Sequence, residues 1–233
     1  MIGVFDSGVG GLNSYRELRR YLPCEDIIYL ADRKNAPYGT KDEKTLIKLT
    51  KNDIRVLTDM GADKILIACC TASTVYDRLS DAERRISVPI IEPSARLAAK
   101  GGRKIAVIAT ERTAASHAFG EKISALDPRC EVAEIPTQIL VELAERGYSD
   151  KFMDGFSEKI IDGVADRIRD TRADTLVLGC THFSCFGDAL SSRLPGVAVI
   201  NPARIGAHAL ISTYKNEKYR RGKANGRSVY IEA

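Results

Sequence analysis

Long apolar runs are missing from this chain of 233 residues. No stretch approaches the ~18 consecutive apolar residues that a membrane-spanning helix needs. The chain opens on a strand-like segment, residues 1–5, and not on the basic segment of a signal peptide. We therefore expect no membrane partner and a cytoplasmic location.

Histidine is also scarce, with three copies at positions 117, 182 and 208, and no two cysteines have C-x-x-C spacing. Zinc sites usually contain such pairs, so we expect no bound metal. The six cysteines should be free thiols in a reducing cytosol. Cys24, Cys130 and Cys185 are interpreted as core residues, the ordinary environment of a free cysteine.

Charge is balanced, with a net value of +4, and much of the basic excess lies in residues 215–227. We interpret this stretch as solvated surface, with an acidic partner or nucleic acid as the alternative. The modest net charge favours the first reading, so no nucleic-acid partner is expected. A length of 233 residues with 44% hydrophobic content suits one large domain or two small halves.

Short runs rich in isoleucine and valine alternate with longer segments of helical periodicity, which is typical of parallel strands joined by crossover helices. The expected strands are residues 1–5, 27–31, 64–68, 88–91, 104–109, 131–135, 175–179 and 197–200. The expected helices are residues 41–60, 114–126, 157–170 and 203–214, with a further one around 15–22. The sequence therefore predicts an α/β fold, in which ligands gather beyond the carboxyl ends of the strands.

Two of these strands end in the same kind of motif. Residues 64–68 are followed by Cys69, Cys70 and Thr71, and residues 175–179 by Cys180 and Thr181. A thiol at a strand-to-helix turn feels the positive end of the helix dipole, which can lower its pKa toward neutrality. The neighbouring hydroxyl and backbone N–H groups can hold a carboxylate. We expect Cys69 and Cys180 to form a matched pair of acid/base thiols.

The first loop, FDSGVGG at residues 5–11, follows a strand and precedes a helix. Its glycines permit a phosphate cradle, but the lysine of a P-loop is missing and no acidic residue is clearly placed for a dinucleotide. We interpret Asp6 and Ser7 as polar groups held over the same sheet edge, where a carboxylate can orient an ammonium or accept a thiol proton.

Five stretches together resemble the glutamate racemases of the aspartate/glutamate racemase superfamily, in the right order and over almost the whole chain. They are IGVFDSGVGGL at 2–12, YLADRKNAPYGTK at 29–41, IACCTAS at 67–73, VELAERG at 141–147 and LGCTHF at 178–183. The resemblance implies two pseudo-symmetric parallel-sheet halves with helices on both faces and the active site in the cleft between them. The first half would be residues 1–93 plus 203–233, with Asp6 and Cys69. The second would be residues 94–202, with Glu145, Cys180 and His182.

The same resemblance implies a role for each matching residue. The catalytic group would be Cys69 and Cys180, with Asp6 supporting Cys69, and His182 and Glu145 supporting Cys180. Ser7, Pro37, Tyr38, Gly39, Cys70, Thr71, Thr113 and Thr181 would surround the substrate. Inversion needs a base on one face of the Cα and an acid on the other, which two opposed thiols supply. No pyridoxal phosphate or other cofactor is implied, so hydroxyl and N–H groups around the carboxylate must stabilise the carbanion.

One position departs from the family pattern. An asparagine ordinarily follows the first thiol, and this chain has Cys70 there. The substrate is expected to be glutamate, whose D form feeds bacterial peptidoglycan. Aspartate or another amino acid, or binding of an amino acid without catalysis, are the alternatives. Helices on both faces of the sheets offer several apolar surfaces through which two copies of the chain could form a homodimer.

Overall fold

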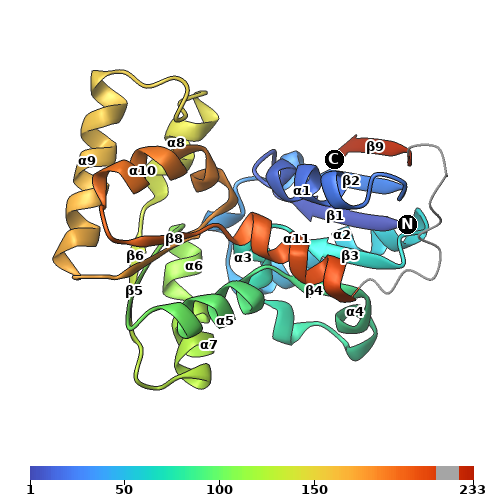
Figure 1. The fold of residues 1–233 in the computed structure, drawn as a ribbon. Coiled ribbons are helices and arrows are strands. Elements are labelled where there is room, and N and C mark those ends of the chain that lie inside the picture. Colours follow the sequence, from blue (N-terminus) through green and yellow to red (C-terminus); the bar gives the residue numbers. More distant parts are fainter. Residues whose placement is uncertain (214–225) are drawn as a thin grey trace. The chain divides into compact units, whose positions relative to one another are not determined.

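The computed structural model describes residues 1–213 and 226–233, and the chain divides into two compact units (Figure 1). Unit 1 consists of Met1–Ile90 and Ala203–Ala233, and unit 2 of Ile91–Pro202. The boundary expected at residue 93 falls inside helix α5 (Ile91–Gly101), which lies wholly in unit 2. Most of the basic stretch expected on the surface, residues 215–225, lies outside the described residues.

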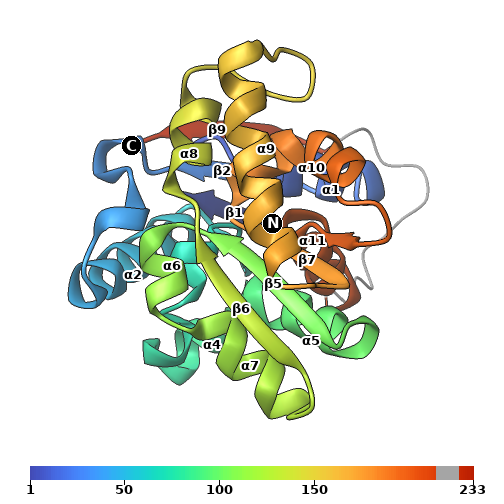
Figure 2. The same ribbon diagram turned by 90° about the vertical axis from the view of Figure 1, so that its left-hand side faces the viewer.

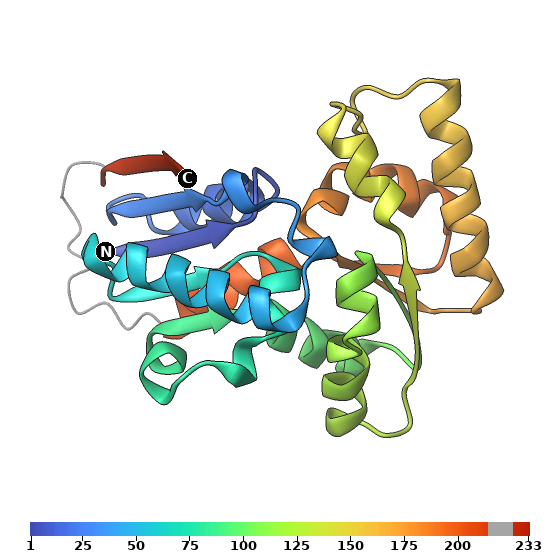
Figure 3. The same ribbon diagram turned by 180° about the vertical axis from the view of Figure 1, so that it is seen from behind.

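Unit 1 contains a parallel sheet with the strand order β4-β3-β1-β2-β9. Figure 1 shows α1 and α11 in front of this sheet, and Figure 3, from behind, shows α2 on the opposite face. The strands are β1 (Ile2–Asp6), β2 (Ile27–Ala31), β3 (Lys64–Ile67), β4 (Ser87–Pro89) and β9 (Ser228–Glu232). The helices are α1 (Leu12–Tyr21), α2 (Glu43–Asp59), α3 (Cys70–Ser73), α4 (Asp81–Ile86) and α11 (Pro202–Thr213), with short 3-10 turns η1 (Arg33–Asn35), η2 (Tyr38–Thr40) and η3 (Tyr76–Arg78).

Unit 2 repeats this order, with its four parallel strands arranged as β6-β5-β7-β8. Figure 2 shows α8, α9 and α10 on one side of the strands, and α5, α6 and α7 on the other. The strands are β5 (Lys104–Ala109), β6 (Glu131–Pro136), β7 (Thr175–Gly179) and β8 (Ala198–Ile200). Besides α5, the helices are α6 (Glu111–Ala115), α7 (Ala118–Leu126), α8 (Gln138–Glu145), α9 (Gly155–Asp170) and α10 (Gly187–Arg193), with the 3-10 turn η4 (Thr181–Phe186).

The buried face of each sheet explains why these segments fold as they do. In unit 1 the apolar stripe of α2, which includes Leu46, Ile54 and Leu57, packs on the buried side chains of the sheet. Asp42 caps this helix by accepting a hydrogen bond from the Thr45 N–H at 2.7 Å. In unit 2 the corresponding core joins β5 and β7 to α8, α9 and α10. The expected α/β class with two parallel sheets is confirmed.

Some expected elements differ in the structure. The single helix expected over residues 114–126 is two helices, α6 and α7, because His117 between them has a left-handed backbone with φ 53°. Helices α4, α5, α8 and α10 and the edge strand β9 were not among the segments singled out from the sequence. No helix in the described part of the chain is long and apolar enough to cross a membrane.

Candidate active site

The strand order marks one place in each sheet where a ligand can bind. From β1 the chain moves to β2 on one side and to β3 on the other, and β5, β6 and β7 repeat this arrangement. Side chains and loops diverge at such a switch point, which leaves room beyond the carboxyl ends of the two strands. The ends of β1 and β3 carry Asp6 and Cys69, and β7 is followed by Cys180. The two thiols thus lie at equivalent positions of two similar sheets.

Cys69 caps the short helix α3 in unit 1. Its Sγ accepts a hydrogen bond from the Ala72 N–H at 3.5 Å and lies 3.8 Å from the Ser7 hydroxyl oxygen. Burial and, to a lesser extent, the negative charge of Asp6 raise the pKa of Cys69 to about 12, although hydrogen bonds from Ala72 and Ser7 act in the opposite direction. The lowered pKa expected for this thiol is therefore wrong in the free protein. A helix of four residues adds too little dipole to offset burial.

Asp6 is fully buried at the end of β1, on the strand next to β3. Its Oδ1 accepts a hydrogen bond from the Gly8 N–H at 2.9 Å, and the Gly8 carbonyl accepts one from the Tyr29 hydroxyl at 2.8 Å. Gly11 makes room for this arrangement, because a Cβ there would lie 2.7 Å from the Asp6 Cβ and 2.9 Å from the Tyr29 hydroxyl. The first loop is therefore folded around a carboxylate of the chain itself.

The remaining expected substrate residues of unit 1 lie on two short turns that contact each other, η2 and α3. Cys70 and Thr71 are buried on α3, and Tyr38 and Gly39 are buried on η2, whereas Pro37 is exposed. The Tyr38 side chain points into the core of unit 1, where its hydroxyl is bonded to the carboxylates of Asp32 and Asp53. Sequence reasoning missed both acids: Asp32 lies within the stretch at residues 29–41 but was given no role there, and Asp53 lies in no motif.

Cys180 in unit 2 lies at one end of a chain of three side chains. Its Sγ is 3.7 Å from Nδ1 of His182, and Nε2 of His182 is 2.6 Å from Oε1 of Glu145. Glu145 is the last residue of α8, and its side chain is 52% exposed, whereas that of His182 is 11% exposed. A proton on Cys180 therefore has a hydrogen-bonded route through the imidazole toward solvent.

Thr181 and Thr113 are both buried in unit 2. Thr113 is held by Thr110, whose hydroxyl donates to the Thr113 hydroxyl at 2.9 Å and accepts from the Thr113 N–H at 3.2 Å. Thr110 directly follows β5 and so lies at the switch point of this sheet. Sequence reasoning missed Thr110, although its place after a predicted strand was a usable signal.

The other cysteines and histidines are used elsewhere. All six cysteines are free, and the thiol of Cys130 is buried against backbone carbonyls of the α5–β5 turn. His117 pairs with Glu134, and His208 with Glu17. Within residues 1–213 and 226–233, no group of three or more His, Cys, Asp or Glu side chains is arranged to hold a metal ion.

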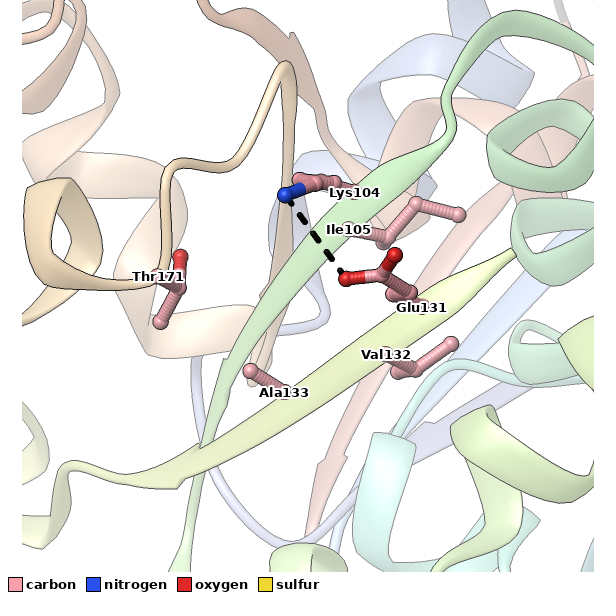
Figure 4. Close-up of a pocket in the computed structure, with 6 residues that line it drawn as sticks. All are labelled: Lys104, Ile105, Glu131, Val132, Ala133 and Thr171. Atoms are coloured by element: carbon pink, nitrogen blue, oxygen red, sulfur yellow. Dashed lines mark ion pairs between the residues drawn. The ribbon is translucent and has the colours of Figure 1, made fainter. Parts of the chain in front are cut away.

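A shallow pocket of about 250 Å³ lies at the amino ends of strands β5 and β6, opposite to the strand ends near Cys180 (Figure 4). Lys104 and Glu131, the first residues of β5 and β6, line it and form an ion pair at 3.8 Å. None of the expected catalytic residues lines this pocket. Because ligands bind beyond carboxyl strand ends in such sheets, the candidate positions are the strand ends followed by Cys69 in unit 1 and by Cys180 in unit 2.

Residues 16–210 match the Asp/Glu/Hydantoin racemase family. A glutamate racemase of Gloeobacter violaceus is 34% identical over 205 residues, which cover 87% of this chain and 76% of that protein. A glutamate racemase of Campylobacter curvus is also 34% identical, over 99% of this chain and 88% of that protein.

Solved structures give the same result. The glutamate racemase of Francisella tularensis, in complex with D-glutamate, superposes with a TM-score of 0.89 at 29% identity, covering 99% of this chain and 87% of that one. An aspartate racemase of Picrophilus torridus shares the fold, with a TM-score of 0.63 at 20% identity over 91% of this chain and 93% of that one.

Proposed function

This chain belongs to the Asp/Glu/hydantoin racemase family, and from that premise we propose that it interconverts L- and D-glutamate without a cofactor. The observation that carries the proposal is the pair of thiols at equivalent switch points of two parallel sheets. The relatives named as glutamate racemases, and the similar structure that holds D-glutamate, support this choice of substrate. The product would supply D-glutamate for peptidoglycan in the cytoplasm, where cysteines stay reduced.

In this mechanism one thiolate removes the α-proton and the other thiol returns a proton to the opposite face. Neither residue alone can serve both faces of the Cα, so inversion requires Cys69 and Cys180 together. The first half of the enzyme would be residues 1–93 plus 203–233, and the second half residues 94–202. Each half then contributes one proton carrier.

Cys69 rests as the thiol at neutral pH because burial raises its pKa to about 12. It is therefore ready to donate in one direction of the reaction. For the other direction, a substrate ammonium near Asp6 would offset the negative charge that opposes the thiolate. Ser7, whose hydroxyl lies 3.8 Å from the sulfur, would donate to the thiolate once it forms.

Cys180 exchanges its proton through His182, and Glu145 holds the imidazole in the orientation that faces the sulfur. The contact of 2.6 Å between Glu145 and His182 favours the tautomer that carries hydrogen on Nε2, which leaves Nδ1 free to accept the thiol proton. Deprotonation of Cys180 therefore does not depend on a charge supplied by the substrate, in contrast to that of Cys69.

The substrate carboxylate develops negative charge as the α-proton leaves, and hydroxyl and N–H donors must stabilise it. We assign substrate binding to the polar and backbone groups at the strand ends of both halves: Ser7, Pro37, Tyr38, Gly39, Cys70, Thr71, Thr113 and Thr181. For Tyr38 the backbone makes the contact, since its hydroxyl is bonded to Asp32 and Asp53.

One observation favours a second substrate. Cys70 replaces the asparagine that the resemblance leads one to expect, and a thiol is a poor hydrogen-bond donor. Racemisation of aspartate by the same thiols is therefore the second candidate function.

Circular dichroism of L- and D-glutamate, L- and D-aspartate and several neutral amino acids with the purified protein tests the proposal. We expect glutamate to racemise from both directions, with one solvent deuterium incorporated at Cα per inversion in D₂O. Dialysis against a chelator should leave the rate unchanged. Fast turnover of aspartate with none of glutamate would show that aspartate is the substrate. Binding of an amino acid without deuterium exchange would show that the protein binds amino acids without catalysis.

A further inference from the structure

Three buried polar side chains lie beneath the turn that carries residues 37–39. Asp32 directly follows β2, Tyr38 begins η2, and Asp53 projects from α2; each side chain is at most 2% exposed. The Tyr38 hydroxyl oxygen lies 2.6 Å from Oδ2 of Asp32 and 2.8 Å from Oδ2 of Asp53. Two carboxyl groups therefore share one hydroxyl in a place without solvent.

A count of hydrogens indicates that this cluster contains one more proton than it would have with both aspartates ionised and the tyrosine neutral. A tyrosine hydroxyl has a single hydrogen and can donate to one carboxylate at a time. The second short contact therefore needs a hydrogen on a carboxyl group. The side-chain amide of Asn35 donates to both oxygens of Asp32, at 2.9 and 3.0 Å, so both of these oxygens already act as acceptors. The extra proton thus belongs on Asp53.

The electrostatics of the cluster agree with this count. Burial and, to a lesser extent, the charge of Asp32 raise the pKa of Asp53 to about 7, although hydrogen bonds from Tyr38 and Asn52 act in the opposite direction. Burial also raises the pKa of Tyr38, so its hydroxyl stays protonated. The elements packed against α2 are β1, β2 and α3, and the titratable groups at their ends are Asp6, Asp32 and Cys70. The groups that act on the pKa of Asp53 are Asp32, Tyr38 on η2 and the amide of Asn52.

The cluster is connected to the thiol site of unit 1. The Asp32 N–H donates to the carbonyl of Asp6 at 3.0 Å, and η2 contacts α3, the helix that Cys69 caps. Asp53, Tyr38 and Asp32 thus tie together α2, the turn over residues 37–39 and the end of β1. The cluster is therefore bonded to the strand that ends at Asp6 and lies on a turn that contacts the helix capped by Cys69.

We infer that Asp53 is a positioning residue for racemisation, which in its protonated form donates to Tyr38 and so holds residues 37–39 against α3 for substrate binding. The inference rests on the proposed function. When Asp53 loses its proton, two carboxylates face a single hydroxyl hydrogen, and Tyr38 can no longer satisfy both. Substrate affinity then decreases, while the two thiols and the His182 relay are untouched.

Kinetics between pH 6.5 and 8.5 test this inference. In the wild-type protein we expect the KM for glutamate to rise about three- to tenfold with pH, with a much smaller change in kcat. Asp53→Asn places a permanent N–H donor against the Tyr38 oxygen, so its KM should stay near the low-pH value throughout. Asp53→Ala removes the donor and should have a raised KM at every pH. Asp59→Asn, at the exposed end of the same helix, is the matched control and should follow the wild type.

Thermal unfolding gives a readout that does not depend on turnover. Asp53 has a higher pKa in the folded protein than its ordinary value of 3.8. Between about pH 4 and pH 7 the folded state therefore holds a proton that the unfolded state has already released. Wild-type stability therefore falls as pH rises through that window. The Tm of Asp53→Asn minus that of the wild type should rise from pH 4 to 7 and stay level above it.

The two readouts separate the ways in which the inference can fail. Absence of amino-acid racemisation refutes the proposed function. Turnover with the same KM profile in Asp53→Asn and wild type overturns the positioning role of Asp53. A Tm difference that does not change with pH shows that Asp53 carries no extra proton, which overturns the inference even if a variant is inactive.

Discussion

The two thiols occupy the same place in two similar sheets and yet have different neighbours. Cys69 follows β3 and lies among buried groups, with the carboxylate of Asp6 nearby and its closest hydroxyl on Ser7. Cys180 follows β7 and contacts His182, which is bonded to the half-exposed Glu145. The repeated fold therefore supplies two equivalent positions, and the side chains that surround the two thiols differ.

This difference indicates how each thiol exchanges protons with water. Cys180 has a side-chain route to solvent through His182 and Glu145, so under the proposed mechanism we expect it to regain its protonation state between turnovers. In the part of the chain that the structure describes, the hydrogen-bond partners of Cys69 are Ser7 and the Ala72 N–H, which are not bases, and burial favours the protonated thiol. We therefore expect the resting enzyme to hold Cys69 as the thiol, which suits the direction of reaction in which Cys69 donates the proton.

The largest effect is expected from removing either thiol. Cys69→Ala and Cys180→Ala should each lower kcat by about a thousandfold or more, because general acid–base groups contribute ~10²–10⁴ and inversion stops when one face lacks a proton carrier. Racemisation followed by circular dichroism measures this, with Cys24→Ala as the control. Retention of more than about a tenth of the wild-type rate by either variant would contradict the two-thiol mechanism.

A second prediction compares the reactivity of Cys69 with that of an ordinary thiol. At pH 8 a pKa of about 12 leaves very little of Cys69 as thiolate. Its alkylation should therefore be on the order of a thousandfold slower than that of a thiol with a pKa of ~8.5. The rate should rise about tenfold per pH unit up to pH 10. Mass spectrometry of the native protein with iodoacetamide measures it for each cysteine, and the unfolded chain is the control. Fast labelling of Cys69 at pH 7 would show a lowered pKa instead.

Much of the scaffold could be predicted because its signals are local. The strand ends before Cys69 and Cys180 follow from short apolar runs that stop at small and polar residues. Strand β9 was missed because it pairs with β2, about two hundred residues away, and its exposed Val229 and Tyr230 give no buried pattern. The break at His117 depends on a single backbone angle that no residue pattern announces.

The chemistry of the site was less predictable than its place. A pKa depends on burial in the folded state, so the position of Cys69 at a helix start suggested the wrong direction of shift. The contacts of Tyr38 with Asp32 and Asp53 join residues 6 and 15 positions apart, which only the packing of α2 brings together. By contrast, the expected roles of the thiols and of His182 stay predictions until they are tested.

A third prediction concerns the position after each thiol, where unit 1 has Cys70 and unit 2 has Thr181. Cys70 is 2% exposed on α3. If an amide is needed there to bind a charged group of glutamate, the missing bond costs about 1.5–3 kcal/mol, or roughly ten- to a hundredfold in kcat/KM. Cys70→Asn should then improve kcat/KM for glutamate by that factor. Cys70→Ser, which has a hydroxyl and no amide, is the matched control. An unchanged or lower value in Cys70→Asn, together with efficient turnover of another amino acid by the native protein, would remove glutamate as the substrate.

The smallest effect is expected at the outer end of the Cys180 relay. Glu145 holds His182 with a side chain that is 52% exposed, and ion pairs this open contribute ~0–1 kcal/mol. Glu145→Gln keeps a hydrogen-bond acceptor for Nε2 of His182, so kcat should fall only about two- to fivefold. His182→Asn removes the proton acceptor of Cys180 and should cost about a hundredfold or more. Glu142→Gln, on the exposed side of the same helix, should have no effect. Measuring kcat for all three variants in both directions locates the proton route. If Glu145→Gln were as slow as His182→Asn, the Glu145 carboxylate would itself carry the proton. Both thiols would then depend on a carboxylate, Cys69 on Asp6 and Cys180 on Glu145.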